Sequence, residues 1–325
     1  MAKVVVVGGA GYIGSHAAKA LAKAGHSVTV VDNLSTGHRS LARYGTFREG
    51  DLADRAFLNS VLTEVSPDAV FHFAAKSLVG ESVDAPAAYY ATNVAGTLNL
   101  LEAMRALPSL PALVFSSTCA LYGATDEPVS ELAAVAPLNP YARTKRMIEE
   151  MLGDFGAAYG LRWVSLRYFN AAGADADGEL GELHDPETHL IPRLLLNALD
   201  ERHYPVQIFG DDYNTPDGTC IRDYVHVEDL ADAHIRAMEY LLRGGGSDVF
   251  NLGTTKGASV REVIRAVERV TGKKLHVPVG PRRAGDPPRL VAGSKKARNI
   301  LSFVPRHDLE SMVRSAWNYL KEKRR

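Results

Sequence analysis

The 325-residue sequence has few cysteines, no excess of one charge and no long apolar run. Its two cysteines, Cys119 and Cys220, exclude a disulfide scaffold and fit a reducing compartment. Lys and Arg number 37 against 38 Asp and Glu, so no net field attracts nucleic acid or an anionic membrane surface. No run approaches the roughly 18 apolar residues of a membrane-spanning helix, and the first strand leaves no space for a signal segment. We therefore expect a cytoplasmic protein without nucleic-acid or membrane partners.

Four valines, Val4–Val7, lead directly into the segment Gly-Gly-Ala-Gly-Tyr-Ile-Gly-Ser. An unbroken β-branched run is typical of a strand buried on both faces of a parallel sheet. In the turn that follows, Gly8 permits a tight bend, Gly11 lets the backbone approach a pyrophosphate, and Gly14 lets the next helix pack closely. The start of that helix offers unpaired N–H groups and the positive end of its dipole to phosphates.

Three glycines alone can mark a turn that binds nothing. Here a strand precedes them, a helix is expected at 15–24, and an apolar run at 27–31 ends on Asp32, about 20 residues beyond Gly11. An acidic residue at that place accepts hydrogen bonds from ribose hydroxyls and repels a 2′-phosphate. The sequence therefore predicts NAD rather than NADP, and the alternative is an empty turn with Asp32 as a simple helix cap.

Short apolar runs alternate with helical patterns along the chain, which is the signature of βαβ units. Strands are expected at 28–32, 46–49, 69–73, 112–116 and 163–167, and helices at 53–64, 88–107 and 141–159. Beyond residue 167 the pattern becomes irregular, and it returns with a strand at 224–227 and a helix at 228–242. A further helix is expected at 309–323. The predicted fold class is α/β, a doubly wound parallel sheet of the Rossmann type with a smaller C-terminal α/β domain.

Ligands of doubly wound sheets bind beyond the carboxyl ends of the strands. Asp51 and Leu52 follow the third strand and can bracket an adenine ring, although Asp51 can equally be a helix N-cap. The fourth strand leads into Phe73-Ala74-Ala75, and Lys76 then either reaches a phosphate or ribose or is a solvated lysine. Asn93, in an apolar helix, either secures a neighbouring loop or contacts the cofactor.

A second helix start carries groups suited to proton transfer. Asn139 is a good N-cap and Pro140 a good first helical residue. Tyr141 and Lys145, four residues apart, then share one helix face. A nearby ammonium favours the phenolate, whose pKa is otherwise about 10, and allows it to act as a general base. Thr118, at the end of a Ser/Thr-rich strand, can hydrogen-bond the reacting oxygen; without the glycine pattern, the Tyr/Lys pair would be a simple helix-surface pair.

Together these segments resemble the extended short-chain dehydrogenase/reductase superfamily and, within it, the UDP-glucose (UDP-galactose) 4-epimerase family. The resemblance covers essentially the whole chain, in GGAGYIGS (8–15), VDNLSTG (31–37), FAAKSLVGESV (73–83), FSSTCALYG (115–123), NPYARTK (139–145), LRYFNAAGA (166–174) and YNTPDGTCIRDYVHVEDL (213–230). It implies an NAD that stays bound and is used catalytically. Tyr141 would remove the 4-hydroxyl proton while hydride passes from C4 to NAD; the 4-keto sugar would then rotate and take the hydride back on its other face. UDP-glucose and UDP-galactose would thereby exchange.

The resemblance also implies the roles of individual residues, with Thr118, Tyr141 and Lys145 catalytic. The implied cofactor-binding residues are Gly8, Gly11, Tyr12, Ile13, Gly14, Asp32, Asn33, Leu34, Ser35, Thr36, Gly37, Asp51, Leu52, Phe73, Ala74, Ala75, Lys76, Asn93, Ser116, Tyr141, Lys145 and Tyr168. The implied substrate-binding residues are Thr118, Tyr141, Asn170, His189, Leu190, Gln207, Phe209, Arg222, Arg283, Asp286 and Leu290. Two guanidinium groups would clamp the diphosphate, those of Arg222 and Arg283, with the choice between Arg282 and Arg283 left open.

Three alternatives stay open. A nucleotide-sugar 4,6-dehydratase typically has an Asp-Glu pair directly after the strand-end Thr, where this sequence has Cys119 and Ala120. Leu290, of intermediate size, permits either exchange of UDP-glucose with UDP-galactose or a preference for UDP-GlcNAc and UDP-GalNAc. The third alternative is an NAD-binding sensor or scaffold without activity, and the intact catalytic residues argue against it.

Two interleaved domains are expected: an NAD-binding domain at 1–168 plus about 224–248, and a nucleotide-sugar-binding domain at 169–223 plus about 249–325. The resemblance implies a homodimer through the helices near 88–107 and 143–159. His184, Asp185, Glu187 and His189 superficially resemble metal ligands, but their spacing fits no compact zinc pattern. We therefore expect a solvated polar loop there and no metal.

Overall fold

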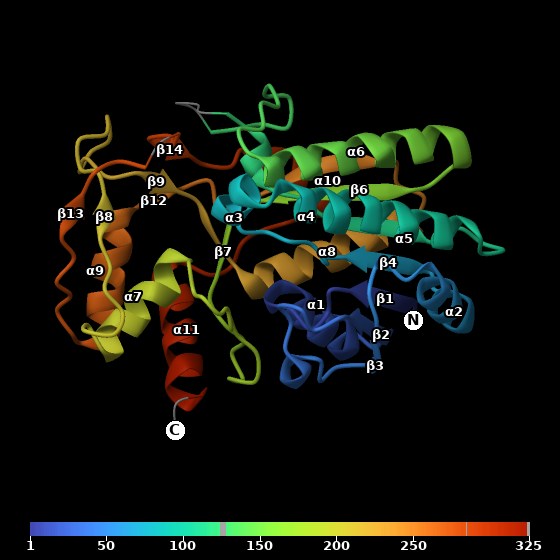
Figure 1. The fold of residues 1–325 in the computed structure, drawn as a ribbon, viewed down its shortest axis with the longest axis horizontal. Helices are drawn as coiled ribbons and strands as arrows, with labels where there is room; N and C mark the ends of the chain where they lie inside the picture. Colours follow the sequence, from blue (N-terminus) through green and yellow to red (C-terminus); the bar gives the residue numbers. More distant parts are fainter. Residues whose placement is uncertain (124–127, 284, 324–325) are drawn as a thin grey trace.

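The structure, a computed structural model, describes residues 1–123, 128–283 and 285–323. Its largest element is a wholly parallel seven-stranded sheet with the strand order β11-β6-β5-β4-β1-β2-β3 (Figure 1). Its strands are β1 (Lys3–Val7), β2 (Ser27–Asp32), β3 (Thr46–Glu49), β4 (Ala69–His72), β5 (Ala112–Ser116), β6 (Trp163–Tyr168) and β11 (Asp248–Leu252). Val4–Val7 are fully buried, as their unbroken apolar run predicts, and the doubly wound class is confirmed.

Helices cover both faces of this sheet. One face packs against α1 (Tyr12–Lys23), α8 (Val227–Leu242) and α10 (Lys295–Leu301). The other face packs against α2 (Arg55–Val65), α5 (Gly96–Arg105) and α6 (Pro140–Tyr159). Successive strand residues serve opposite layers, since Val70 of β4 belongs to the second core and Phe71 to the first.

The chain returns to the main sheet later than expected. β10 (Tyr224–His226) pairs with β7 (Asn170–Ala172) in a separate two-stranded parallel sheet. Helix α8 then packs on the main sheet, and β11 pairs with β6 at its edge. The segment thus stays in the sheet to Leu252, beyond the boundary expected near residue 248. The sequence did not indicate this, because a short apolar edge strand after a helix has no periodicity that distinguishes it from a buried loop.

The remaining elements form a smaller unit, on the left of Figure 1. Its core lies between α7 (Leu190–Leu199), α9 (Val260–Thr271) and α11 (Leu309–Lys323), the last with the bounds that the sequence predicts. Its short strands form one sheet of β12 (Ala258–Ser259), β9 (Ile221–Arg222) and β14 (Arg289–Leu290), and a second of β8 (Ile208–Phe209) and β13 (Val279–Gly280). Because these pairings join distant segments, loops from several parts of the chain meet beside the main sheet.

Helix α6 begins where the sequence predicts. The side chain of Asn139 accepts a hydrogen bond from Ala142 N at 2.9 Å, and Pro140 is the first helical residue. Gly160, with φ of 74°, ends the helix in the left-handed region that favours glycine. This local chemistry fixes the place of Tyr141 in the first turn.

The helix expected at 88–107 is composite. It consists of α4 (Pro86–Tyr89), a π-helical stretch η2 (Tyr90–Ala95) and α5, preceded by α3 (Val79–Asp84). Two 3₁₀ turns, η1 (Arg39–Leu41) and η3 (Cys119–Leu121), complete the described elements. π-helical turns are rare and often mark functional sites, and this one contains the fully buried Asn93.

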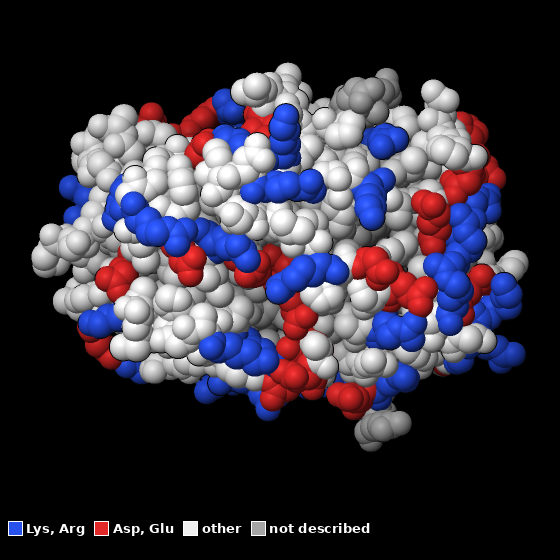
Figure 2. All heavy atoms as spheres, turned by 180° about the vertical axis from the view of Figure 1, so that it is seen from behind, with Lys and Arg blue, Asp and Glu red and all other residues white. Residues whose placement is uncertain are grey.

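Charged side chains of both signs are distributed over the surface. Figure 2 shows basic and acidic groups interspersed on the face opposite to that of Figure 1, consistent with the near-neutral composition. Within the three described ranges, no helix has the length and apolar character needed to cross a membrane.

Candidate active site

A cavity of about 1130 Å³ lies between the main sheet and the smaller unit. It is lined by residues that follow β1, β2, β4, β5 and β6, and by residues of α7, β8 and β9. The residues implied to bind cofactor or substrate all line it, with two exceptions, Leu34 and Asn93. One cavity therefore brings the predicted cofactor and substrate residues together.

The two exceptions have structural roles. Leu34, with φ of 59°, packs its side chain against the core, and its backbone N donates to Asp32 Oδ1 at 2.9 Å. Asn93 accepts from Lys76 N at 2.8 Å and donates to Lys76 O and to Thr144 Oγ1, each at 3.0 Å. These contacts secure the loop at Lys76, which is one of the two roles expected for Asn93.

The glycine turn is too tight for side chains at two of its three positions. Gly8 has φ of +83°, and a Cβ there would lie 2.4 Å from Ala74 N. A Cβ on Gly14 would lie 2.2 Å from Gly8 O, so the close packing of α1 on β1 requires glycine. Gly11 differs, because a Cβ there would meet no atom nearer than Gly8 O at 3.4 Å, and Gly11 lines the cavity. The fold itself therefore leaves room for a side chain at Gly11.

The two acidic residues beside this turn are held in place by the protein. Asp32 Oδ2 accepts from Ala10 N at 2.9 Å, which ties the end of β2 to the glycine turn. An ionised carboxylate has about four acceptor positions, so Asp32 retains capacity for ribose hydroxyls. Asp51 accepts from Asn33 Nδ2 at 2.5 Å, and the cap of α2 is Asp54. The helix-cap role considered for Asp51 is therefore wrong, because the helix starts one turn later.

The three predicted catalytic side chains meet beyond the end of β5. Tyr141 and Lys145 lie one turn apart on α6, and a hydrogen bond joins Tyr141 to Thr118. Lys145 Nζ donates to the backbone O of Ser116 at 2.8 Å and lies 5.9 Å from the centroid of the Tyr141 ring. The spacing in the sequence thus becomes a cluster that faces the cavity.

Burial governs the charges of this cluster. It raises the pKa of Tyr141 well above the ordinary value, against the opposing hydrogen bond from Thr118. It also lowers the pKa of Lys145 to about 7, against the opposing charge of Glu149. The expected lowering of the Tyr141 pKa by Lys145 is not found, because the ammonium is directed at the Ser116 carbonyl and desolvation dominates both groups. Ionisation of Tyr141 near neutral pH therefore requires a further positive charge nearby.

A buried ion pair fixes α6 against the sheet beneath the cluster. Arg167 Nε donates to Glu149 Oε1 at 3.0 Å, and its Nη2 makes a second, short bond to Glu149 Oε2. The same carboxylate accepts from Ser117 Oγ and Ser165 Oγ, each at 2.7 Å. Glu149 follows Lys145 by four residues, so the network fixes the helix face that carries the lysine. The sequence analysis missed this pair, although an arginine within an apolar strand was an available signal.

Lys76 has partners in the protein. Its ammonium pairs with Glu81 at 2.9 Å and lies 5.7 Å from the centroid of the Tyr89 ring. The side chain also lines the cavity, so both alternatives considered for it, a ligand contact and an exposed lysine, remain compatible with its place. Tyr89 itself was not anticipated as a support for this loop, because its contact depends on the turn between β4 and α3.

An ion pair occupies the substrate end of the cavity. Arg222, on β9, pairs with Asp286, and Cys220 Sγ donates to Asp286 Oδ2 at 3.7 Å. A guanidinium has five N–H donors, so this contact leaves others for a phosphate. Asn170 on β7 and Leu290 on β14 line the same cavity, as do His189, Leu190 and Gln207.

The two adjacent arginines near Asp286 point in different directions. The Arg283 guanidinium lies 3.8 Å from the centroid of the Phe209 ring, and both residues line the cavity. Arg282 instead donates to Asp212 Oδ1 at 2.6 Å on the exposed surface and is not a lining residue. Of the two candidates, Arg283 therefore faces the site.

Further lining residues escaped the sequence analysis because no motif marks them. They include Pro192, Arg193, Pro205, Val206, Gly210, Tyr224 and Pro278. Several flank β8 and β13, whose pairing joins segments about 70 residues apart. Their place in the wall depends on that pairing, which local sequence does not encode.

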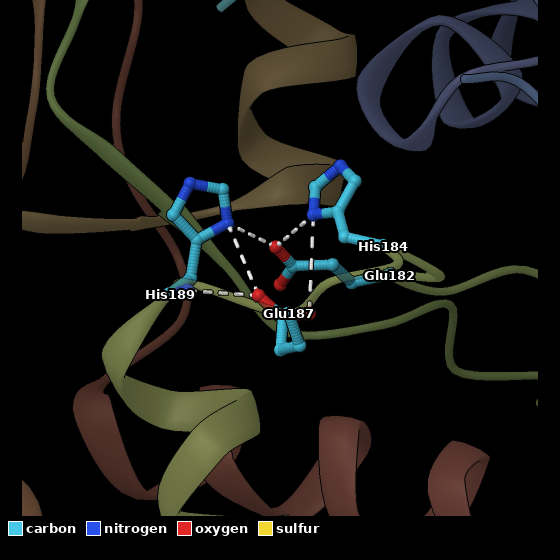
Figure 3. A group of neighbouring side chains, drawn as sticks. All are labelled: Glu182, His184, Glu187 and His189. Atoms are coloured by element: carbon cyan, nitrogen blue, oxygen red, sulfur yellow. Dashed lines mark hydrogen bonds and ion pairs between the residues drawn. The ribbon is translucent and has the colours of Figure 1, made fainter. Parts of the chain in front are cut away.

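The polar segment before α7 is a partly exposed loop whose carboxylates are more buried than expected. His184, Glu187 and His189 gather around Glu182, which the sequence analysis did not name, and Asp185 is not part of the group (Figure 3). The Glu182 and Glu187 side chains are only 6% and 10% exposed. The segment folds back on itself before α7, and this turn brings together side chains whose spacing in sequence suggested no site.

A doubly wound parallel sheet, a Gly-x-x-Gly-x-x-Gly turn and a Tyr-x-x-x-Lys pair beside a strand-end threonine together define a dinucleotide-dependent enzyme of the short-chain dehydrogenase/reductase type. Comparison with known protein families supports this class of enzyme. The NAD dependent epimerase/dehydratase family matches residues 4–253, and the chain belongs to this family.

Individual relatives are similar over almost their whole length. The UDP-glucose 4-epimerase of Rhizobium meliloti (strain 1021) is 51% identical over 317 residues, which are 97% of this chain and 96% of the relative. The crystal structure of UDP-glucose 4-epimerase from Brucella ovis in complex with NAD is 52% identical, with a TM-score of 0.94 and 98% of each chain covered. The UDP-Glc/GlcNAc 4-epimerase of Campylobacter jejuni is 40% identical, with a TM-score of 0.86, and the match covers 99% of this chain and 100% of that one.

Proposed function

We propose that this chain interconverts UDP-glucose and UDP-galactose by inverting C4 of the sugar through a transient 4-keto sugar, with NAD retained between turnovers. The observation that carries the proposal is the single cavity, in which Thr118, Tyr141 and Lys145 face the same space as the glycine turn. The UDP-glucose 4-epimerases of Rhizobium meliloti and Brucella ovis, about half identical to this chain over nearly the full length, support the same activity.

The residues of the glycine turn fit NAD. Gly11 leaves an opening toward the cavity that any side chain would reduce, and the start of α1 directs backbone N–H groups there. Asp32 would accept the adenosine ribose hydroxyls and disfavour a 2′-phosphate. When bound, NAD⁺ supplies the acceptor for hydride from C4 and a positive charge that favours the Tyr141 phenolate.

The chain's own catalytic groups move and hold one proton. The Tyr141 phenolate would take the proton of the 4-hydroxyl and later return it, while Thr118 would hydrogen-bond the same sugar oxygen. Lys145 would act through charge and position, since its Nζ is fixed by the Ser116 carbonyl. Thr118, Tyr141 and Lys145 all line the cavity, so these groups would act on one bound sugar.

The other end of the cavity suits a nucleoside diphosphate. Arg222 and Arg283 would bind the diphosphate oxygens through paired N–H donors, and Asn170 would hold a sugar hydroxyl or phosphate oxygen. Asp286, now paired with Arg222, would accept the uridine ribose hydroxyls. Phe209 would offer an apolar face to the uracil ring. Binding at this end leaves the sugar free to rotate beside Tyr141.

The dehydratase alternative lacks a suitable acid and base. Cys119 and Ala120 occupy the positions of its carboxyl pair, and burial raises the pKa of the Cys119 thiol to about 12. A neutral thiol with so high a pKa is a poor acid or base at neutral pH. The range of sugars is a separate question: Leu290 lines the cavity, and a relative that acts on both UDP-Glc and UDP-GlcNAc has the same fold.

One assay tests the function. The purified chain is given UDP-galactose without added NAD, and the nucleotide sugars are separated and identified. UDP-glucose is the expected product. A 4-keto-6-deoxy sugar would favour the dehydratase, and no turnover by a chain that carries NAD and binds UDP-sugar would favour a sensor. With UDP-GlcNAc as substrate, a rate similar to that for UDP-galactose would overturn the narrow sugar range.

We further propose the domain division 1–168 plus 224–252 for NAD, and 169–223 plus 253–325 for the nucleotide sugar. The pairing of β11 with β6 supports the later boundary at Leu252. A homodimer through α5 and α6 is also proposed. Its support is the exposure of apolar side chains on these helices, which is 42% for Leu98, 41% for Met147 and 51% for Tyr159. Sedimentation of the purified chain would show a single-chain mass if the dimer proposal were wrong.

A further inference from the structure

Four metal-binding side chains converge beside the cavity, in the segment that precedes α7 (Figure 3). One ligand atom from each of Glu182, His184, Glu187 and His189 lies within 4.8 Å of every other. His184 Nδ1 lies 2.9 Å from Glu182 Oε1 and 3.8 Å from Glu187 Oε2. His189 Nδ1 lies 3.7 Å from Glu187 Oε1 and forms a shorter contact with Glu182 Oε1. The four groups point toward one common space.

These distances approach those of a tetrahedral zinc site. Zn²⁺ binds imidazole nitrogen and carboxylate oxygen at about 2.0–2.2 Å, which places neighbouring ligand atoms roughly 3.3–3.5 Å apart. Small side-chain rotations of Glu182 away from the imidazoles, and of Glu187 toward them, would satisfy this geometry. Two nitrogen and two oxygen ligands suit Zn²⁺, whereas Ca²⁺ and Mg²⁺ favour oxygen ligands alone.

The two carboxylates lie against the two imidazoles and not against a lysine or arginine. They are 6% and 10% exposed, and their ion-pair partners among the described residues are His184 and His189. His184 Nδ1 is buried and, although close to Glu182, makes no hydrogen bond within the described chain. The neutral imidazole presents this nitrogen to both carboxylates, in the position that a shared metal ion requires.

We propose that Glu182, His184, Glu187 and His189 bind one Zn²⁺. His184 and His189 line the cavity, whereas Glu182 and Glu187 do not, so the ion would enter from the side of the histidines. His189 is also the residue directly before α7. The metal would therefore fix the segment that leads into this helix, and it would do so whether or not the proposed epimerisation takes place.

The segment also contacts the NAD-binding unit. The His184 ring meets the Tyr12 ring edge-on, with centroids 6.4 Å apart, and His38 Nε2 donates to Leu183 O at 2.8 Å. Tyr12 is the first residue of α1 and lines the cavity. A zinc ion here would hold a contact between the two proposed domains at the start of α1. Removing it is expected to loosen that contact, and added Zn²⁺ is expected to raise the melting temperature.

The test compares zinc binding by the wild-type chain and by matched variants, each freed of metal with a chelator and then dialysed. The site variants are Glu182→Gln combined with His184→Gln, and His184→Gln alone as the milder change. His203→Gln is the control, because His203 pairs with Asp200 at 2.7 Å on the exposed surface without a second histidine. His307→Gln tests the other histidine pair of the chain, that of His226 and His307.

Bound metal is measured by elemental analysis and by competition with a chromophoric chelator, and Co²⁺ replaces Zn²⁺ for spectroscopy. The wild type and both control variants are expected to hold about one Zn²⁺ per chain and to show the visible bands of four-coordinate Co²⁺. Both site variants are expected to lose the ion, the bands and the rise in melting temperature. Equal binding by wild type and His184→Gln, loss of binding only in His307→Gln, or no binding by the wild type would each overturn the proposal.

Discussion

Replacement of Lys145 by methionine is expected to make the protein more stable in a way that depends on pH. Methionine has nearly the same length as lysine and carries no charge. Burial lowers the pKa of Lys145 from 10.5 to about 7 in the folded chain, so between these values the unfolded chain binds the additional proton. The resulting penalty on folding is complete below pH 7 and disappears as the pH rises toward 10.5. The substitution removes this penalty where it exists.

The size of the effect follows from the two pKa values. At pH 6 the buried ammonium costs about 4–5 kcal/mol of folding free energy, and at pH 9 about 2 kcal/mol remains. Loss of the bond from Lys145 Nζ to the Ser116 carbonyl, 2.8 Å long, costs the variant about 1–3 kcal/mol at every pH. That constant loss cancels when two pH values are compared. The stability advantage of the variant should therefore fall by roughly 2–3 kcal/mol between pH 6 and pH 9.

Urea unfolding of both proteins at pH 6, 7, 8 and 9, after removal of NAD, measures this difference. Lys256→Met, at an exposed lysine, is the matched control and should show no such pH trend. The Lys145→Met variant should also lose most of its turnover. A stability difference that is the same at pH 6 and pH 9 would refute the argument, since burial of Lys145 would then not lower its pKa in the folded chain.

Three further outcomes are expected. Gly11→Ala should fold, because the new methyl group meets no protein atom nearer than 3.4 Å, but it should lose its retained NAD because the methyl group narrows the space for the pyrophosphate. Gly14→Ala should instead melt at a lower temperature, since its methyl group would lie 2.2 Å from the Gly8 carbonyl oxygen. Released NAD and melting temperature distinguish the two. Tyr141→Phe should keep NAD and lower turnover by about 10²- to 10⁴-fold in the UDP-galactose assay. Glu149→Ala should lower the unfolding free energy in urea by about 3–5 kcal/mol, because it strands the Arg167 charge.

Each of these has a result that would contradict it. NAD retained at wild-type levels by Gly11→Ala would mean that this opening does not face the cofactor. A Tyr141→Phe variant with unchanged turnover would remove the phenol from the mechanism. A Glu149→Ala variant as stable as the wild type would show that the charge of Arg167 finds water or another partner at no cost.

Local chemistry made the cofactor half predictable. The valine run of β1, the glycines and Asp32 are close in sequence, and Asn139 with Pro140 fixes the start of α6. Other features depend on contacts across the chain. The π-helical turn that buries Asn93 has no propensity signal, and the pairing of Arg222 with Asp286 joins residues 64 apart. Such contacts follow from the assembled fold rather than from any local pattern.

The same distinction applies to the charges of Tyr141 and Lys145. Spacing correctly placed Tyr141 and Lys145 on one face of α6, but their pKa values depend on burial and on a third residue. Glu149, one turn further, would support a charged Lys145, yet its carboxylate is committed to Arg167 and two serines. The network therefore holds the helix while leaving the lysine poorly compensated. Burial favours the neutral phenol of Tyr141 and lowers the pKa of Lys145 to about 7. The positive charge of bound NAD⁺ would favour the Tyr141 phenolate, so we expect proton transfer to depend on an occupied cofactor site.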